Sequence, residues 1–196
     1  MTSKALFNYI IVKFIRDKFV IAMALAVVMC GMSIYSLYAQ NEGAPQMNLL
    51  DFQLTDLNGE TINTKDLEGK VVVFDFWATW CAPCIKSFPA MIEVQHSFKE
   101  NKEVLFLFVN TLEIEGRDGD FIARFLDKKG IDLMVYLDRA KPGSEPLSER
   151  LGISSLPYKI IVDKSGEIRY MDSGFSGGSE DFKNELNDKI NSLLDS

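Results

Sequence analysis

Two stretches of the chain are almost continuously apolar, and each has the length of a β-strand. The first, KVVVFDFW, covers residues 70–77, and the second, EVLFLFVN, covers residues 103–110. Strands that are apolar on both sides of the pleat are typical of a sheet covered on both faces. The pattern therefore predicts two buried strands. We expect a helix to follow the cysteines at positions 81 and 84, because Pro83 suits a first helical turn, where its missing N–H is no loss.

The second half of the chain alternates between helical and extended patterns. Residues 120–130 carry apolar side chains at helical spacing and end at Gly130, which predicts a helix. Residues 132–138 are expected to form another strand, and residues 158–172 a β-hairpin that turns at Ser165-Gly166. Strands that alternate with helices, followed by a closing hairpin and a helix, indicate an α/β protein with a mixed sheet.

The C-terminal segment has the pattern of an amphipathic helix. It opens with Ser179 as a candidate N-cap, and two acidic residues follow in the first turn. Four apolar side chains then fall on one helical face, which predicts that the helix packs against the sheet: Phe182, Leu186, Ile190 and Leu193.

The domain at residues 49–196 is expected to begin with an additional N-terminal β-hairpin. In LLDFQLTDLNGETIN, Asn58-Gly59 lies between two alternating segments, a strong signal for a type I′ turn.

A different kind of segment precedes this domain. Residues 19–39 carry no formal charge and are long enough to cross a bilayer as a helix. Residues 1–18 form a basic leader, which favours the cytoplasmic side, so the rest of the chain would be exported. We expect residues 19–39 to be a membrane anchor or a cleaved signal peptide, followed by a linker at 40–48; the length of the apolar run favours the anchor. Lipid attachment at Cys30 is disfavoured, because the apolar run continues beyond it.

The charge of the chain is acidic. It has 21 Lys and Arg against 28 Asp and Glu, a formal net charge of −7, and the basic leader contributes four of the cations but only one of the acids. An acidic exported domain is a poor candidate for binding nucleic acid, so we expect no nucleic-acid partner.

The chemistry of the domain centres on two cysteines. Cys30 lies in the apolar segment, which leaves Cys81 and Cys84 as a CxxC pair in WCAPC. Such a pair is either half of a zinc site or a redox dithiol. Zinc needs four ligands, or three and a water, and the one histidine, His96, lies twelve residues beyond Cys84. We therefore expect no metal and no cofactor, and a surface position for His96.

The dithiol interpretation gives the two cysteines different roles. Cys81 would lie at the N-terminus of a helix, where free N–H groups and the helix dipole favour a thiolate that attacks a substrate disulfide. Cys84, one turn later and more enclosed, would then attack Cys81 and release the reduced substrate. Trp80 would shield the site on the solvent side.

Asp75 is the one acidic residue in the apolar strand that leads to the cysteines. Burial raises the pKa of a carboxyl group, so Asp75 could lie beneath the cysteines and take the proton from Cys84. A solvent-facing position at a strand end or bulge is the alternative. If the carboxylate is buried without a partner, Asp75→Asn should also stabilise the fold modestly.

The segments FWATWCAPC and LGISSLPYKIIVD together resemble the thioredoxin superfamily, and the fuller pattern is similar to its TlpA/ResA-like extracytoplasmic branch. The resemblance implies a thioredoxin fold and thiol-disulfide oxidoreductase activity. It also implies a cis peptide bond at Leu156-Pro157, opposite the cysteines, where the backbone of Leu156 would pair with an incoming substrate strand. Trp80 and Pro83 complete the substrate-binding residues that we infer.

The chain also departs from the branch. Tyr158 follows the expected cis-proline where many members have Thr, and Ser87 stands three residues beyond the second cysteine where many have Glu. The second departure puts in doubt a role confined to cytochrome c maturation. An aspartate at position 75 resembles the pattern of classical thioredoxin, whereas some members of the branch carry Asn at this position.

Protein disulfides are the expected substrates, and a membrane thiol-electron donor is the expected partner, because an oxidising compartment would keep the pair oxidised. We expect the protein to work as a reductant, since Ala82-Pro83 places no cation beside Cys81 to stabilise a strongly oxidising dithiol. The alternatives are a disulfide oxidase or isomerase with the same site and a copper-binding module. A thiol peroxidase is less favoured, because the residues around Cys81 do not match its pattern.

Overall fold

A computed structural model of the protein describes residues 52–138, 145–175 and 179–195. The basic leader, the apolar segment at 19–39 and the linker at 40–48 lie outside the described residues. Within those residues, no helix has the length and apolar character needed to cross a membrane.

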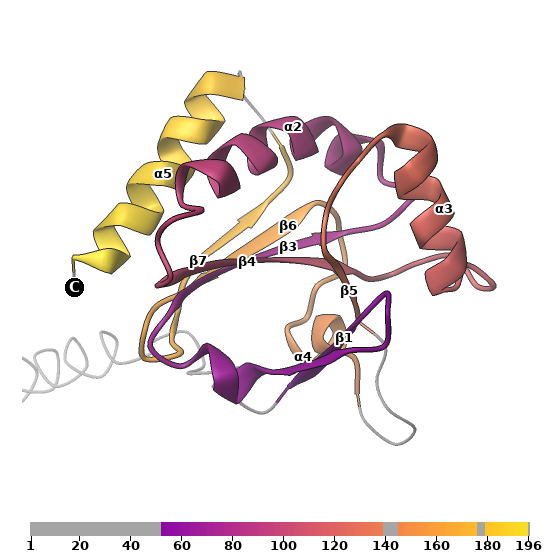
Figure 1. The fold of residues 1–196 in the computed structure, drawn as a ribbon, viewed down its shortest axis with the longest axis horizontal. Helices are drawn as coiled ribbons and strands as arrows, with labels where there is room; N and C mark the ends of the chain where they lie inside the picture. The colour runs from indigo at the N-terminus through magenta and orange to yellow at the C-terminus, as the bar shows by residue number, and fades with distance from the viewer. Residues whose placement is uncertain (1–51, 139–144, 176–178, 196) are drawn as a thin grey trace, which may run out of the picture. The chain divides into compact units, whose positions relative to one another are not determined.

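The centre of the described part is a mixed sheet in the order β2-β1-β5-β4-β3-β6-β7 (Figure 1). β3 lies between β4, to which it is parallel, and β6, to which it is antiparallel. β5 continues the parallel part, whereas β1, β2 and β7 pair antiparallel to their neighbours. This arrangement confirms the predicted fold class. The strands are β1 Gln53–Asp56, β2 Thr61–Asn63, β3 Val71–Trp77, β4 Val104–Asn110, β5 Val135–Leu137, β6 Tyr158–Val162 and β7 Ile168–Ser173.

Helices cover the two faces of the sheet unequally. Figure 1 shows α2, α3 and α5 on one side of the sheet and the short α4 on the other. α2 and α5 also contact each other. The helices are the 3-10 helix η2 Thr64–Leu67, α2 Ala82–Ser97, α3 Gly119–Lys129, α4 Leu147–Arg150 and α5 Ser179–Leu194.

Successive side chains of β3 point to opposite faces of the sheet and so belong to two separate apolar clusters. Val73 and Trp77 belong to the cluster under α2, α3 and α5, which also contains both cysteines. Phe74 and Phe76 belong to the cluster on the other face. Every residue of β3 is buried, as its apolar run predicts. Since side chains two apart share a face, Asp75 lies on the face of Val73 and Trp77, under α2 and α5.

The helix predicted at residues 120–130 is α3, and its predicted end agrees with the structure. Its N-cap, which was not predicted, is Asp118, whose side chain accepts from the N–H of Phe121 at 2.9 Å. Gly130 ends α3 with φ +65°, a left-handed conformation that glycine adopts without steric cost. In α5, which begins at Ser179, the side chains of Leu186, Ile190 and Leu193 are buried on one face.

The turn between β1 and β2 is not of the predicted type. A type I′ turn needs positive φ at both central residues, whereas Gly59 has φ +86° and Asn58 does not have a positive φ. Instead, Gly59 N–H donates to the carbonyl of Asp56, and the carboxylate of Asp56 accepts from the N–H groups of Asn58 at 2.9 Å and Glu60 at 2.8 Å. The prediction of a type I′ turn was wrong, because the Asp56 carboxylate captures the loop backbone.

Candidate active site

The two cysteines lie where β3 passes into α2. Cys81 is the N-cap of α2, and its Sγ accepts from the backbone N–H of Cys84 at 3.2 Å. The two side chains form a disulfide, with Cα atoms 5.3 Å apart. Pro83 is exposed in the first turn of the helix. The predicted helix start and the proximity of the two sulfurs are both confirmed.

Exposure does not separate the two cysteines in this disulfide-bonded form. Cys81 is 2% exposed and Cys84 is 1% exposed. The expected greater enclosure of Cys84 is therefore absent here. The geometric difference between them is their place on the helix, since Cys81 caps its N-terminus and Cys84 lies inside the first turn.

Trp80 flanks the disulfide as the most exposed large side chain of the active-site turn. It is 47% exposed, and its indole N–H donates to the carbonyl of Leu112 at 2.8 Å. Leu112 is itself exposed and is the one non-glycine residue with positive φ (+49°) within the described ranges. The hydrogen bond thus joins the turn before Cys81 to the loop after β4.

The partly buried carboxylate of Glu113 makes a second connection between the same two segments, and no pattern in the sequence predicted it. Glu113 accepts from the backbone N–H of Thr79 at 2.8 Å and from its hydroxyl at 2.9 Å. It also accepts from the N–H of Ile114 at 3.0 Å and from the amide of Asn110 at 3.2 Å, and Arg117 lies 3.4 Å away. Burial alone would raise the pKa of Glu113, but these hydrogen bonds together hold it below its ordinary value.

Asp75 is buried, as predicted, but it has a partner that sequence reasoning missed. The side chain of Asp75 is 2% exposed, and its Oδ1 lies 3.3 Å from the Nζ of Lys159, which is 4% exposed. The two residues are directly paired across β3 and β6. Burial raises the pKa of Asp75, and the attraction of Lys159 opposes this rise without cancelling it. A lysine within YKIIV, the otherwise apolar strand β6, was the available signal.

The peptide bond between Leu156 and Pro157 is cis, as the resemblance implied. Pro157 is buried, and its carbonyl accepts from the N–H of Gly174 at 2.8 Å. Leu156 is partly buried against the cluster that contains both cysteines. The segment before β6 therefore packs against the same core as the active-site turn.

Ser87 occupies the position, three residues beyond Cys84, where many members of the branch carry Glu. It is fully buried, and its hydroxyl donates to the carbonyl of Cys84 at 2.8 Å. The side chain supports the first turns of α2 and brings no charge to the site. His96, on the same helix, is exposed, as predicted.

Comparisons with known proteins agree with this geometry. The AhpC/TSA family model matches residues 45–171. The thiol-disulfide oxidoreductase ResA of Bacillus thuringiensis (strain Al Hakam) is 32% identical over 60% of this chain and 63% of its own length, so the match spans less than two thirds of that relative. The ResA of Bacillus cereus (strain ATCC 10987 / NRS 248) is 30% identical over 70% of this chain and 76% of its own.

The fold of the chain is also similar to that of a solved structure. A putative thiol:disulfide interchange protein DsbE from Chlorobium tepidum has 26% sequence identity and a TM-score of 0.60, covering 75% of this chain and 95% of its own. The sheet, its helices and the paired cysteines at a helix N-terminus define a thioredoxin-fold protein with a dithiol site. The chain belongs to the AhpC/TSA family.

Proposed function

We propose that the protein is a thiol-disulfide oxidoreductase that reduces disulfide bonds in other proteins. The observation that carries this proposal is the Cys81–Cys84 pair at the N-terminus of α2. In the reduced form, the thiolate of Cys81 attacks a substrate disulfide and one substrate sulfur leaves as a thiolate. Cys84 then attacks the sulfur of Cys81, and the second substrate sulfur leaves. Two electrons pass to the substrate, and the protein is left with its own disulfide.

Asp75 is the proposed proton acceptor for Cys84. It is buried on the face of β3 that lies under α2, and the cysteines belong to the apolar cluster on that face. A carboxylate here can take the proton of Cys84 as that thiol becomes a nucleophile, which is general-base catalysis. A raised pKa moves a carboxyl group toward the pH at which it exchanges protons most effectively.

Four residues are proposed to bind the substrate. Trp80 and Pro83 are exposed on either side of Cys81 and are available for contact. Leu156 and Pro157 precede β6, and an extended substrate segment could pair with the backbone there. Protein substrates fit such a surface, because the recognition uses main-chain and apolar contacts.

The proposed location is extracytoplasmic, with residues 19–39 as a membrane anchor or a signal peptide. In an extracytoplasmic location the Cys81–Cys84 pair would need electrons from a membrane thiol donor, because the surroundings oxidise dithiols. A disulfide oxidase or isomerase would use the same cysteines. A copper-binding module is less well supported, because a third soft or imidazole ligand is needed and His96 is exposed on α2.

The decisive measurement is the reduction potential of the Cys81–Cys84 couple, together with its redox state in cells. A potential near that of thioredoxin, about −270 mV, and a mainly reduced pair would support the reductase. A potential near that of a strong oxidant, about −120 mV, with a mainly oxidised pair, would instead favour the oxidase. Purified protein that retains copper and exchanges no disulfides would support the binding module.

A further inference from the structure

Three large apolar side chains are exposed beside the disulfide, and we call them the apolar patch. Trp80 directly precedes Cys81 and is 47% exposed. Leu112 and Ile114 lie in the loop after β4 and are 40% and 49% exposed. The indole N–H of Trp80 donates to the carbonyl of Leu112, so the two segments lie side by side. Single exposed apolar residues are common on protein surfaces, whereas a group of them next to a reactive centre is typical of an interaction site.

The backbone of Leu112 has an unfavourable conformation. Its φ of +49° lies in the left-handed region, where a side chain crowds the backbone and glycine is the usual residue. Glycine would let the carbonyl at this position accept from Trp80 with less strain, so the hydrogen bond alone does not explain a leucine. Residues in such conformations cluster at functional sites. What leucine adds at this position is an exposed apolar side chain beside the disulfide.

Hydrogen bonds fix the loop that carries Leu112. Glu113 accepts from the N–H and the hydroxyl of Thr79, in the active-site turn, at 2.8 and 2.9 Å. Arg117, farther along the loop, donates to the same hydroxyl at 2.6 Å. The side chains on either side of Glu113 are therefore presented on an ordered backbone. Such a surface loses little conformational entropy when a partner binds to it.

Leu112 and Ile114 also line a groove of about 370 Å³ between this loop and the start of α4. The volume falls in the range of pockets that accept ligands, roughly 300–1,000 Å³. The charged residues that line the groove are mainly acidic: Glu113, Glu115, Asp138 and Glu149 against Arg117. Arg117 pairs with Glu113 at 3.4 Å. Glu115 and Glu149 are exposed and form no ion pair among the described residues.

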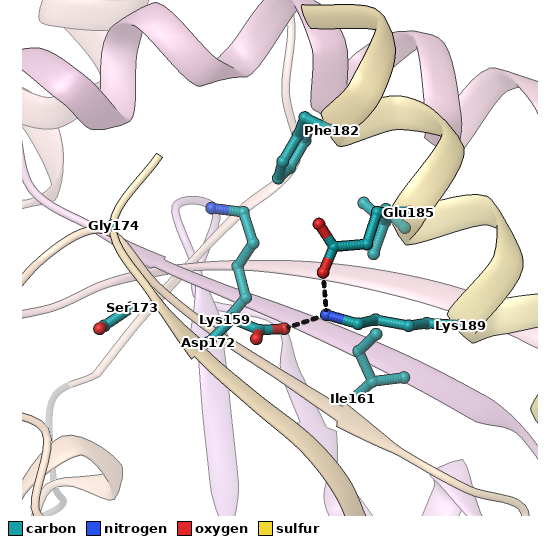
Figure 2. Close-up of a pocket in the computed structure, with 9 residues that line it drawn as sticks. Lys159, Ile161, Asp172, Ser173, Gly174, Phe182, Glu185 and Lys189 are labelled. Atoms are coloured by element: carbon teal, nitrogen blue, oxygen red, sulfur yellow. Dashed lines mark hydrogen bonds and ion pairs between the residues drawn. The ribbon is translucent and has the colours of Figure 1, made fainter. Parts of the chain in front are cut away.

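A second cavity, between β6, β7 and α5, has a different balance of charge (Figure 2). Its two carboxylates, Asp172 and Glu185, both pair with the Nζ of Lys189, at 2.7 and 2.6 Å. Little negative charge is left there to attract a partner. The described lining of the groove beside Leu112 keeps an excess of carboxylates, so the partner that complements it carries positive charge.

We propose that the apolar patch and the groove bind the segment of a substrate protein that flanks its disulfide, and that Leu112 determines the preference for this segment. The preferred segment is extended, with an apolar side chain next to its cysteine and a lysine or arginine a few residues away. The apolar side chain would contact Leu112 and Ile114, and the cation would lie near Glu115 and Glu149. This inference rests on the proposed function, since a substrate disulfide must reach Cys81.

The test compares synthetic peptide disulfides that carry Leu or Ser next to the cysteine, and Lys or Glu a few positions away. The wild-type protein should prefer Leu to Ser in kcat/KM by about 4–15-fold, as burial of one or two methylene groups would give. It should also prefer Lys to Glu, and this second preference should weaken as the salt concentration rises.

Two variants should each remove one preference. Leu112→Gly should bring the Leu-to-Ser ratio close to one. Because glycine accepts this φ, the variant should unfold at the same or a higher urea concentration than the wild type, which separates a lost contact from a lost fold. Glu115→Gln combined with Glu149→Gln should bring the Lys-to-Glu ratio toward one. Leu112→Asn, which also tolerates a left-handed backbone, is held to the same outcomes as the glycine variant.

Matched controls remove the same kinds of side chain elsewhere. Met134→Ala removes an apolar side chain that is 66% exposed just before β5. Glu185→Gln removes a carboxylate from the second cavity (Figure 2). Both ratios should equal those of the wild type in each control.

A second readout needs no disulfide exchange. Peptides with serine in place of cysteine are titrated against the protein, and binding is followed by the emission of Trp80, since the other tryptophan, Trp77, is buried. The Leu–Lys peptide should bind more tightly than the Ser–Glu peptide, and Leu112→Gly should reduce the difference. If Leu112→Gly keeps the wild-type ratio and the wild-type binding, the proposal is wrong. Peptide binding with this preference but without any exchange would refute the proposed function alone, whereas exchange without preference would refute the docking surface alone.

Discussion

Replacing Asp75 with Asn is the perturbation that tests the redox site most directly. The change keeps the size of the side chain and removes the base. It also leaves the buried ammonium group of Lys159 without its counter-charge, because the two side chains lie 3.3 Å apart and neither has a hydrogen-bond partner among the described residues. Two effects should follow, one on the rate of the reaction and one on stability.

The effect on stability reverses the expectation drawn from the sequence alone. A carboxylate buried without a partner would make Asn the more stable residue, but Lys159 is a partner. Breaking a buried ion pair by removing one member costs up to about 3–5 kcal/mol. The loss should be smaller here, because burial disfavours the charged form of Asp75 even with Lys159 beside it, and because the remaining lysine can lose its proton. The double variant Asp75→Asn with Lys159→Met should recover most of this loss, since no buried charge then remains.

The contribution of Asp75 to the free energy of unfolding should also depend on pH. Burial raises the folded-state pKa of Asp75 despite the attraction of Lys159. The folded state therefore holds this proton more tightly than the unfolded state does, and the contribution of Asp75 to stability is greatest below its unfolded pKa of about 3.9. That contribution falls as the pH rises toward the folded pKa. Asp75→Asn should lack this part of the pH dependence.

The rate effect should fall on the second step of the reaction. Loss of a positioned general base typically slows a step by about 10²–10⁴-fold, and by less if water can substitute. Attack by Cys81 on a model disulfide should keep its rate, while release of the substrate by Cys84 should slow. Stopped-flow kinetics separates the steps, and urea unfolding at pH 7 gives the free energy of unfolding. Wild-type release together with unchanged stability would refute both the role of Asp75 and the importance of its pair with Lys159.

Three further predictions concern other parts of the chain. Cys84→Ser should trap substrates as stable mixed disulfides on Cys81, whereas Cys81→Ser should trap none; equal trapping, seen on non-reducing gels, would refute the order of attack. Glu113→Gln should lower the free energy of unfolding by about 1–3 kcal/mol at pH 7, because hydrogen bonds to a charged acceptor are lost. Since the pKa of Glu113 is lowered, this difference should fade in urea titrations as the pH falls below about 4, and a constant difference would contradict it. If residues 19–39 are an anchor, the protein should fractionate with membranes, whereas a soluble form that begins just past residue 39 would indicate a cleaved signal peptide.

Sequence alone determined the parts of the protein that depend on neighbouring residues. The apolar run of β3 predicted a strand buried on both faces, and Pro83 beside the cysteines predicted the start of α2. Gly130 marked the end of α3. Such signals are local, since they rest on side-chain periodicity and on the conformations that single residues favour. The cis bond before Pro157 was anticipated by family likeness, not by a local pattern.

Tertiary structure decided the electrostatics of the site. Glu113 reaches Thr79 across a separation of 34 residues, and only the packing of the loop after β4 against the active-site turn brings them together. Lys159 became the partner of Asp75 through the register of β6 against β3. A shift of that register by one residue would turn the lysine to the opposite face of the sheet. Burial, strand pairing and the charge that Asp75 carries therefore depend on contacts between distant segments, which no local pattern in the sequence specifies.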